Sequence, residues 1–578
     1  MSSSLRFIAC ALSFVVSGCG EDATPTPTSS APVTAPTPTP EVTPTAREPE
    51  PPPLVAPESH VEAVGPYQAD TSRDCDGWPA LDLETSEGLC VGIVAHAESA
   101  GIPNPRTRFR PRTIVEDPAH ANVFWIVDAG ARRDRAGRLF RMDATTHPPS
   151  IVSVAERLDR PHGSAIGPDG RLYVGEVHQI VRFDTSFEGA STDVLASREI
   201  VIEGLPTQIP GRDRVRFHPL SAFVFVAPTW DLALNRGSST DHCAESLVEG
   251  LETLEPCHDE LEGTAAVRLY AHSVDADERH TWGGPRTPWA GLRNSVALVA
   301  HPSGTILQGE NATDFPEDDR PNEELNVLAP RNDGRVHYGW PYCYDLDRPD
   351  DRWTRALFSC DPSVNPRYAP PRMLLPAHGA PLGMAYYVGE LAPLRDRLLI
   401  VLHGYRSRGH RVIAIRVDGE GLPVPDAAIE DIVAGWDASD TGPKGTPVSA
   451  TVARDGSVWI VEDNNGTVLR LARDAYAASR RGEAPVITPT EAHADEAFVS
   501  LHRDLLTPRC ARCHEPLRGE ADAALTAITR EGWLREDEGD VLLWQRVRPG
   551  ASRRMPLDGS LTDAETASIR AWLDARSR

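Results

Sequence analysis

Between residues 67 and 475 the chain alternates short apolar runs with polar turn residues. The runs are rich in Val, Ile, Phe, Tyr and Trp, and Gly, Asp, Asn and Pro separate them, which is typical of all-β structure. The clearest unit covers residues 165–184, where two predicted strands flank an Asp-Gly turn and a third strand follows. A similar unit covers residues 450–471. The pattern predicts a series of small antiparallel sheets.

Looser versions of this unit recur through the same region, so that about six repeats are present. They lie at residues 123–143, 217–274, 296–328 and 384–418. Each repeat is too small to bury both faces of its own sheet, and radial packing of such sheets forms a β-propeller. We therefore expect a six-bladed β-propeller over residues 67–475. A pair of β-sandwiches is the alternative, because Asp-Gly hairpins occur in both architectures.

The N-terminal end lacks this pattern. An apolar run from Phe7 to Val16 is followed by small residues and Cys19, which is typical of an export signal too short to span a membrane. The segment from Val16 to Cys19 resembles the cleavage sites of bacterial lipoproteins. We expect residues 1–19 to be a lipoprotein signal peptide and Cys19 to carry the lipid that anchors the chain to a membrane. A plain secretory signal is the alternative.

Residues 20–66 are dominated by Pro and Thr and contain almost no aromatic side chains. Such a composition buries too little apolar area to offset the entropy of the chain, and Pro favours extended spacing. We expect residues 20–66 to form a disordered tether.

The total length of 578 residues requires more than one folded unit. The net charge of -26 argues against nucleic acid as a partner, because phosphates would repel the chain. Export makes disulfides possible. Six of the ten cysteines form three local couples, which we expect to be disulfides: Cys75 with Cys90, Cys243 with Cys257, and Cys343 with Cys360. Unpaired buried thiols are the alternative.

The C-terminal residues 490–578 contain Cys510 and Cys513 followed directly by His514. This spacing lets two thiols bond the vinyl groups of a haem while the imidazole reaches the iron. Met555, one of only five methionines, precedes the last predicted helix and is the expected sixth ligand. We expect a covalent haem c in a small all-α cytochrome c domain, which is similar to class I cytochromes c.

The last helix of this domain has a recognisable start. Thr562 and Glu565 have the spacing of a capping box, and Ile569, Trp572 and Leu573 would form an apolar face.

A series of motifs runs through the predicted propeller in a fixed order. They are Leu158 to Gly163, Gly291 to Asn294, Gly309 to Asn311, Pro321 to Asn326, Tyr338 to Cys343, His378 to Met384, and Leu402 to Gly404. Together they resemble the soluble glucose and sorbosone dehydrogenases that use pyrroloquinoline quinone (PQQ). The resemblance covers most of residues 110–475 and implies a six-bladed propeller, in agreement with the repeat count.

In the resembled enzymes the quinone lies in the central mouth of the propeller, a calcium ion polarises it, and a His removes the proton of the sugar hydroxyl. By match to the motif positions, the resemblance implies that Arg293 and Asn294 contact the quinone. It also implies that Arg406 and Arg408 bind its carboxylates, for which arginine has a suitable forked geometry. For at least one of these two residues, a solvated surface position is the alternative.

The resemblance further implies that Pro321 and Glu323 lie where calcium ligands or their supports are found. Calcium prefers hard oxygen ligands, which this acidic segment offers. The alternative is an acidic loop that is only solvated.

The chain departs from the family at the catalytic base. Just before residues 215–217, where the family has its His, the chain has Ile209 to Asp213 and no His. We therefore expect Asp213, or His162 in a segment that would face the pocket, to act as the base. For His162 a structural hydrogen-bonding role is the alternative.

These features predict a periplasmic or outer-membrane lipoprotein that oxidises a sugar, alcohol or aldehyde with PQQ and Ca2+. The electrons would pass to the covalent haem and then to a periplasmic acceptor. One alternative is a propeller that has lost the quinone site and acts as a binding platform, while the haem alone retains electron transfer. The altered residues around Arg212 favour it. A second alternative is a lactone-hydrolysing propeller with a metal at its centre.

Overall fold

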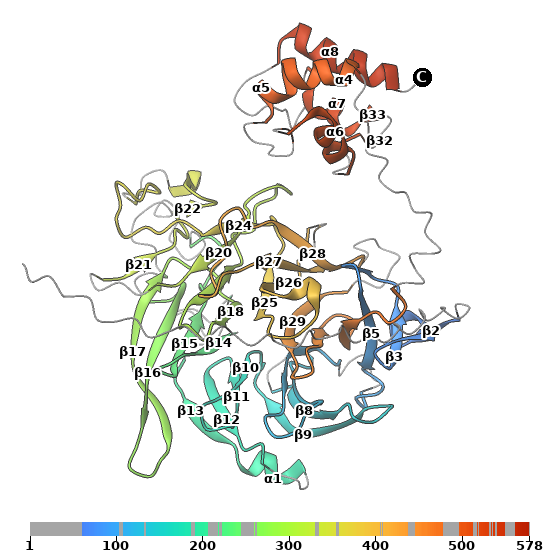
Figure 1. The fold of residues 1–578 in the computed structure, drawn as a ribbon. Helices are drawn as coiled ribbons and strands as arrows, with labels where there is room; N and C mark the ends of the chain where they lie inside the picture. Colours follow the sequence, from blue (N-terminus) through green and yellow to red (C-terminus); the bar gives the residue numbers. More distant parts are fainter. Residues whose placement is uncertain are drawn as a thin grey trace, which may run out of the picture. The chain divides into compact units, whose positions relative to one another are not determined.

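The computed structural model is mainly β and has a β-propeller arrangement (Figure 1), which confirms the all-β class expected for the central region. The described residues are 60–102, 108–131, 135–186, 191–205, 218, 222–243, 259, 263–329, 334–353, 358–404, 406, 408–436, 445–477, 496–511, 517, 519–530, 533–534, 536–537, 540–549 and 561–576.

Six sheets in the described part of the chain have four or more strands. Two are simple four-stranded meanders: β6 (Pro111–Glu116), β7 (Val123–Asp128), β8 (Gly137–Asp143) and β9 (Ser150–Leu158), then β10 (Ser164–Ile166), β11 (Leu172–Glu176), β12 (Gln179–Phe183) and β13 (Glu199–Ile202). The third sheet contains β14 (Phe223–Val226), β15 (Asp231–Arg236), β16 (Ala266–Val274), β17 (His280–Ala290) and the short parallel strand β21 (Val336–His337).

The remaining large sheets follow the same plan. The fourth contains β18 (Ala297–Ala300), β19 (Ile306–Glu310), β20 (Glu323–Val327) and β24 (Met373–Leu375). The fifth contains β25 (Pro381–Tyr386), β26 (Arg397–Leu402), β27 (Arg411–Arg416), β28 (Ile429–Ala434) and β4 (Glu84–Thr85). The sixth contains β29 (Pro447–Val452), β30 (Val458–Glu462) and β31 (Thr467–Arg473), extended by β5 (Leu89–His96), β3 (Trp78–Leu81), β2 (Tyr67–Cys75) and β1 (Val61–Val64).

The sixth sheet joins the two ends of the β region. Strand β5 pairs antiparallel with β31, so that Leu89 lies opposite Arg473 and His96 opposite Thr467. Figure 1 shows the blue strand β5 beside the orange strands of the chain's later part. This pairing closes the series of sheets, because a strand from the start of the β region completes the last sheet.

The first strands of the six sheets form a closed ring. Each contacts the next in the order β6, β10, β14, β18, β25 and β29, and β29 contacts β6 again. Residues at or near the starts of most of these strands line a cavity of about 800 Å³, and residues along the strands line a second cavity of about 350 Å³. Three residues line both cavities: His162, Val296 and Leu382.

Neighbouring sheets pack face to face through large apolar side chains. Phe124 of β7 and Trp459 of β30, on different sheets, have ring centroids 4.1 Å apart. All five residues of β11 are buried, which is expected for a strand covered on both faces. Single sheets of this size are not stable alone, so this packing between sheets supplies the core.

The Asp-Gly turns lie where the sequence predicts them. Asp169 and Gly170 connect β10 with β11, and Asp455 and Gly456 connect β29 with β30. Gly170 and Gly456 have φ values of 73° and 83°, a region that glycine adopts without a steric penalty.

Two of the predicted disulfides, Cys75–Cys90 and Cys343–Cys360, are present. Cys243 is also disulfide-bonded, while its predicted partner Cys257 lies outside the described residues. Disulfides persist in oxidising compartments, so these bonds indicate an extracellular or periplasmic protein.

The predicted tether of residues 20–66 is wrong at its C-terminal end. Val61–Val64 forms β1 and pairs antiparallel with Tyr67 to Asp70 of β2, although the side chains of β1 remain largely exposed. Residues 1–59, including Cys19, lie outside the described residues.

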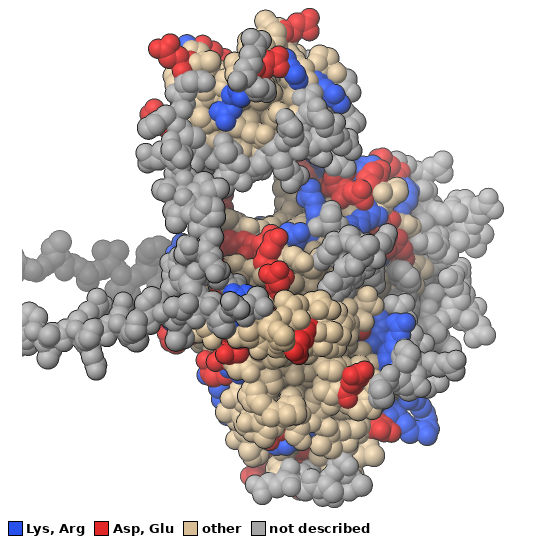
Figure 2. Space-filling view, turned by 90° about the vertical axis from the view of Figure 1, so that its right-hand side faces the viewer, with Lys and Arg blue, Asp and Glu red and all other residues tan. Residues whose placement is uncertain are grey.

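Small elements complete the β region: a hairpin of β22 (Cys343–Tyr344) and β23 (Arg348–Pro349), helix α1 (Ser191–Ala196), and the short 3-10 turns η2 (Asp351–Trp353) and η3 (Ala392–Leu394). On the face shown in Figure 2, acidic and basic side chains lie close to one another. Within the described residues, no helix is both long enough and apolar enough to cross a bilayer.

In the described part of the C-terminal segment, most elements are helices. Its elements are α4 (Glu496–Leu501), the π-helical turn η4 (His502–Leu506), α5 (Thr507–Arg509), α6 (Ala521–Arg530), α7 (Leu542–Val547), α8 (Asp563–Arg576), and a short hairpin of β32 (Glu536–Asp537) and β33 (Asp540–Val541). The rings of Phe498 in α4 and Trp572 in α8 lie 5.0 Å apart in a buried apolar cluster.

The predicted start of the last helix is confirmed. The amide of Glu565 donates to Thr562 Oγ1 at 3.2 Å, and the amide of Thr562 donates to Glu565 Oε2 at 2.7 Å, which is a capping box. Ile569, Trp572 and Leu573 are buried, as the apolar spacing indicated.

Candidate functional site

The larger cavity, which we call the main pocket, has a volume of about 800 Å³ and opens where the first strands of the sheets begin. Such a volume accommodates a cofactor-sized molecule. Its polar and charged lining residues come from all six sheets or the loops next to them: Arg110, Arg112, Arg160, His162, His218, Arg293, Asn294, Asn311, Asp314, Glu323, His378, His403, Arg406 and Asp463. Basic side chains therefore outnumber acidic ones around this cavity.

Asp463, which directly follows β30, organises one wall of the main pocket. It forms ion pairs with Arg112 and with Arg110, the latter at 3.4 Å. Its Oδ1 lies 3.0 Å from His403 Nε2 and accepts the hydroxyl of Thr446 at 2.9 Å. Burial alone would raise the pKa of Asp463, but Arg112, the bond from His403 and Arg110 outweigh burial and lower it. The carboxylate is therefore ionised and holds two guanidinium groups at the pocket.

His162 lies in the main pocket, as expected, but its Nε2 faces an arginine. Arg112 Nη2 lies 2.6 Å from this nitrogen. A guanidinium only donates hydrogen bonds, so His162 Nε2 is the acceptor. A nitrogen whose lone pair is already engaged by a cation is a poor proton acceptor for a substrate.

The other predicted base, Asp213, lies outside the described residues. The structure instead places His218 at the main pocket. The resemblance places the family His before residues 215–217, whereas His218 directly follows them. Sequence reasoning therefore missed His218.

His218 is held by Ser238, which follows β15. His218 Nδ1 lies 2.8 Å from Ser238 Oγ, and the amide of His218 donates to the carbonyl of Ser238 at 3.2 Å. Burial and the charge of Arg293 hold the pKa of His218 well below its ordinary value, and Asp241 opposes them. The imidazole is therefore neutral near pH 7, as a general base must be.

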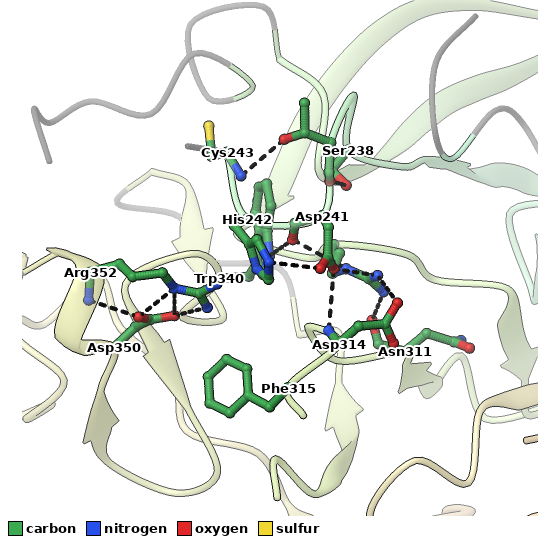
Figure 3. Close-up of polar contacts among 12 residues, drawn as sticks. Ser238, Asp241, His242, Cys243, Asn311, Asp314, Phe315, Trp340, Asp350 and Arg352 are labelled. Atoms are coloured by element: carbon green, nitrogen blue, oxygen red, sulfur yellow. Dashed lines mark hydrogen bonds and ion pairs between the residues drawn. The ribbon is translucent and has the colours of Figure 1, made fainter. Parts of the chain in front are cut away.

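Arg293 lies at the main pocket, as predicted, and contacts with two aspartates and a carbonyl hold its guanidinium in place. Its Nη2 lies 2.6 Å from Asp241 Oδ1 and 3.6 Å from Asp314 Oδ2, and its Nη1 donates to the carbonyl of Asn311 at 2.8 Å. Figure 3 shows Asp241 and Asp314 on either side of this group of contacts. The amide of Asp314 also donates to Asp241 Oδ1 at 3.2 Å. These contacts fix the guanidinium in one orientation.

Asp241 itself is ionised and anchored. Burial raises its pKa, but a hydrogen bond from His242 and the charge of Arg293 outweigh burial and lower the pKa to about 2. The carbonyl of Asp241 accepts Trp340 Nε1 at 3.1 Å (Figure 3). Sequence reasoning missed Asp241, because nothing in its neighbourhood along the chain points to Arg293.

Asn294 also lines the main pocket, as predicted. Its amide donates to Glu310 Oε1 at 3.0 Å, and its carbonyl accepts Asn311 Nδ2 at 3.2 Å. The backbone of this residue is therefore fixed at the start of β18.

The two arginines predicted to bind carboxylates differ in position. Arg406 lines the main pocket, donates to the carbonyls of Phe315 at 2.9 Å and Glu317 at 2.7 Å, and pairs with Asp318 at 3.1 Å. Arg408 is exposed and does not belong to the lining. The structure brings only Arg406 to the other pocket residues.

Glu323, a predicted calcium ligand, is buried at the main pocket. Its Oε2 accepts the amide of Ala312 at 2.6 Å and its Oε1 accepts the amide of Ala380 at 2.8 Å. Burial raises its pKa to about 8 despite these two bonds. Pro321 is buried nearby in sequence but does not line the pocket. Within the described ranges, no group of three or more His, Cys, Asp and Glu residues has the arrangement of a metal site.

Of the predicted haem residues, only Cys510 is described. It follows α5 and is half-buried beside the apolar cluster of the C-terminal segment. Cys513, His514 and Met555 lie outside the described residues.

Comparison with known proteins supports the assignment of the β region. A family model described as TrAA12-like matches residues 110–474, which is more than half of the chain. An uncharacterized protein of Borreliella burgdorferi is 27% identical over 188 residues, which cover 31% of this chain and 47% of that protein. A pyrroloquinoline quinone-dependent pyranose dehydrogenase of Coprinopsis cinerea is 24% identical over 267 residues, which cover 38% of this chain and 36% of that protein. The chain thus spans less than half the length of these relatives.

A solved structure shows the same fold. The calcium structure of the Trichoderma reesei carbohydrate-active enzymes family AA12 superposes with a TM-score of 0.53 and 20% identity, over 69% of this chain and 98% of that one.

Proposed function

Because this chain belongs to the TrAA12-like family, we propose that its propeller is an oxidoreductase that uses PQQ to oxidise a sugar or a related alcohol or aldehyde. A relative named a PQQ-dependent pyranose dehydrogenase supports a pyranose as the substrate class. The proposal concerns the β region alone.

The observation that carries the proposal is the set of donors around the main pocket. Five guanidinium groups, those of Arg110, Arg112, Arg160, Arg293 and Arg406, line one cavity of about 800 Å³. PQQ is a planar tricarboxylate with an ortho-quinone, and arginine binds carboxylates in a forked, charge-assisted geometry. The residues present therefore fit this cofactor, which would supply an electron-accepting quinone when bound.

His218 is the best candidate for the general base. It lines the main pocket next to Arg293, and it is neutral near pH 7. We infer that it takes the proton of the substrate hydroxyl as the two electrons and the carbon-bound hydrogen leave. Arg293 would fix the electron-accepting group beside it, because the contacts to Asp241 and Asn311 leave the guanidinium little freedom. Asp213 is the alternative base.

His218 also bears on the alternative of a catalytically inactive binding platform. That alternative rested on the missing family His before residues 215–217. His218 lies at the pocket directly after this segment and supplies another candidate base, so the missing His does not by itself favour this alternative.

We propose that the propeller has six blades. The closed ring of β6, β10, β14, β18, β25 and β29 supports this number, because each of these strands begins one of the six large sheets.

We propose that calcium, if required, binds near Pro321 through oxygen atoms. Glu323 would contribute only after losing its proton, since burial raises its pKa to about 8. No step of the proposed reaction depends on this ion.

The C-terminal segment is proposed to carry a covalent haem c that accepts the electrons of the propeller. Cys510, Cys513 and His514 would attach and ligate it, and Met555 would be the sixth ligand. The apolar cluster around Phe498 and Trp572 supports a small helical domain able to shield a haem. A downstream periplasmic acceptor and a lipid anchor on Cys19 complete the proposal.

The haem proposal has a direct test. The full chain, produced in a host that matures c-type cytochromes, should show a haem stain that survives denaturation. Replacing both cysteines (Cys510→Ala with Cys513→Ala) should abolish the stain. A wild-type chain without the stain would contradict the proposal and leave the propeller reaction to be explained by itself.

The enzymatic proposal is tested by reconstitution. The purified full chain is incubated with PQQ and Ca2+, and reduction of an artificial electron-accepting dye is followed with a panel of pyranoses, other aldoses and aldehydes. We expect reduction that requires both PQQ and sugar. Absence of PQQ-dependent reduction across the panel would overturn the proposal.

A further inference from the structure

A short chain of hydrogen bonds starts at His218 and ends on a backbone carbonyl. His218 Nδ1 lies 2.8 Å from Ser238 Oγ, and Ser238 Oγ donates to the carbonyl of Thr240 at 2.5 Å. A serine hydroxyl has one proton, and a carbonyl has none to give. Since the Ser238 proton points to Thr240, the oxygen of Ser238 accepts a hydrogen bond from His218.

This order of donors decides where the proton of the imidazole lies. A neutral imidazole carries one proton on either Nδ1 or Nε2, and the partner of one nitrogen selects the tautomer. His218 must donate from Nδ1, so its Nε2 has the lone pair. The nitrogen with the lone pair is the one that accepts a proton from a substrate.

The surroundings keep Ser238 in place. It is fully buried, and its amide donates to the carbonyl of Arg293 at 2.8 Å. The preceding residue, Gly237, packs directly on the histidine: a Cβ at that position would lie 2.4 Å from His218 Cβ. The segment after β15 thus packs closely against His218, and this packing restricts the movement of Ser238.

Among the residues that the structure describes, charges from two other segments act on His218. Arg293, after β17, and Asp241, in the loop after β15, act on the imidazole with opposite signs. Desolvation of this half-buried imidazole and the charge of Arg293 outweigh the charge of Asp241, so the imidazole stays neutral, and its chemistry depends on which tautomer is present.

We propose that Ser238 is a positioning residue that fixes His218 in the tautomer with the proton on Nδ1, which leaves Nε2 to accept the substrate proton. The inference rests on the proposed function for its catalytic meaning, whereas the tautomer itself can be measured without any reaction. A hydroxyl partner orients the imidazole without the charge stabilisation that a carboxylate would give to its protonated form.

The first experiment measures the tautomer. The full chain is labelled with ¹⁵N-histidine, and the signal of His218 is identified by its loss in the His218→Gln variant. Near neutral pH we expect a protonated Nδ1 and an unprotonated Nε2 in the wild type, and a mixture of both tautomers in Ser238→Ala. A wild-type proton on Nε2, or an unchanged tautomer in Ser238→Ala, would overturn the proposal.

The second experiment measures catalysis by the reconstituted enzyme. Ser238→Ala should lower kcat by about 10- to 100-fold with little change in KM, as expected for a misoriented general base. Ser238→Asp should move the acidic limb of the pH profile of kcat/KM to higher pH, because a carboxylate stabilises the imidazolium. Ser273→Ala is the matched control, since Ser273 is exposed and bonds only to β17. Equal profiles in all variants would contradict the proposed role.

The two experiments separate the two claims. If the wild type shows the expected tautomer but oxidises no sugar, the positioning of His218 stands and the proposed function falls. If the enzyme is active but Ser238→Ala changes neither the tautomer nor kcat, the proposed function stands and the role of Ser238 falls.

Discussion

The imidazole of His403 lies 3.0 Å from Asp463 Oδ1, although 60 residues separate the two in the chain. His403 follows β26 of the fifth sheet and Asp463 follows β30 of the sixth, and Asp463 also pairs with Arg112 on β6 of the first. One buried carboxylate thus joins three sheets at the main pocket. Its charge determines the position of the guanidinium groups that we propose bind the cofactor.

Removing this charge should destabilise the propeller. Asp463→Asn keeps the size of the side chain but leaves Arg110 and Arg112 without their counter-ion. Breaking a buried ion pair from one side costs several kcal/mol, and we expect the free energy of unfolding to fall by about 3 kcal/mol. Urea unfolding measures this change. Asp426→Asn, at an exposed turn, is the control, and equal losses in both variants would refute the special role of Asp463.

The two histidines of the main pocket should respond differently to substitution. His218→Gln should lower kcat/KM by about 10²- to 10⁴-fold, the range of a lost general base, while PQQ binding changes little. His162→Gln should mainly weaken PQQ binding, because His162 Nε2 accepts from Arg112 and orients it. Steady-state kinetics and PQQ titration of both variants give the comparison. A larger loss of turnover in His162→Gln than in His218→Gln would reverse the assignment.

Stability should depend on pH through Glu462, which is fully buried and accepts the hydroxyls of Tyr67 and Thr467. Burial raises its pKa from 4.5 to about 7. The folded state therefore holds its proton more tightly than the unfolded state. The stabilisation is complete below pH 4.5 and is lost as the pH rises to about 7, by on the order of 3 kcal/mol.

Glu462→Gln should remove this part of the pH dependence, because an amide does not ionise. Chemical unfolding between pH 4.5 and 7 measures it. Glu420→Gln, at an exposed position, is the control. If the wild type and Glu462→Gln lose stability equally over this range, the buried carboxyl is not the cause.

The disulfide Cys75–Cys90 should stabilise the strands that close the ring, since β2 and β5 both belong to the sixth sheet. Its cysteines are 15 residues apart, and a loop of that length corresponds to about 3 kcal/mol in the chain-entropy account. Replacing both residues (Cys75→Ser with Cys90→Ser) should therefore lower Tm. Calorimetry checks this, and an unchanged Tm would show that pairing of β5 with β31 alone closes the ring.

Local features of this fold could be predicted from the sequence. The Asp-Gly turns, the strands beside them and the capping box at Thr562 depend on neighbouring residues, and the structure contains all of them. The motifs around Arg293 and Asn294 also pointed correctly to the main pocket.

What the sequence could not show depends on distant contacts. The pairing of β5 with β31 joins segments nearly 400 residues apart, and no local pattern encodes it. The same holds for the contacts of Asp463 and Asp241, whose partners lie on other sheets or loops. His218 was missed for another reason: the resemblance places the base before residues 215–217, and His218 follows them.

The binding of PQQ to the purified full chain tests the central claim most directly. Calorimetric titration should show one PQQ per chain for the wild type. The affinity should be at least about tenfold lower in Arg112→Gln and in Arg293→Gln, because each loses a charge-assisted bond. It should be unchanged in Arg416→Gln, whose side chain is exposed on β27. Absence of binding, or equal affinity in all four proteins, would contradict a PQQ site in the main pocket.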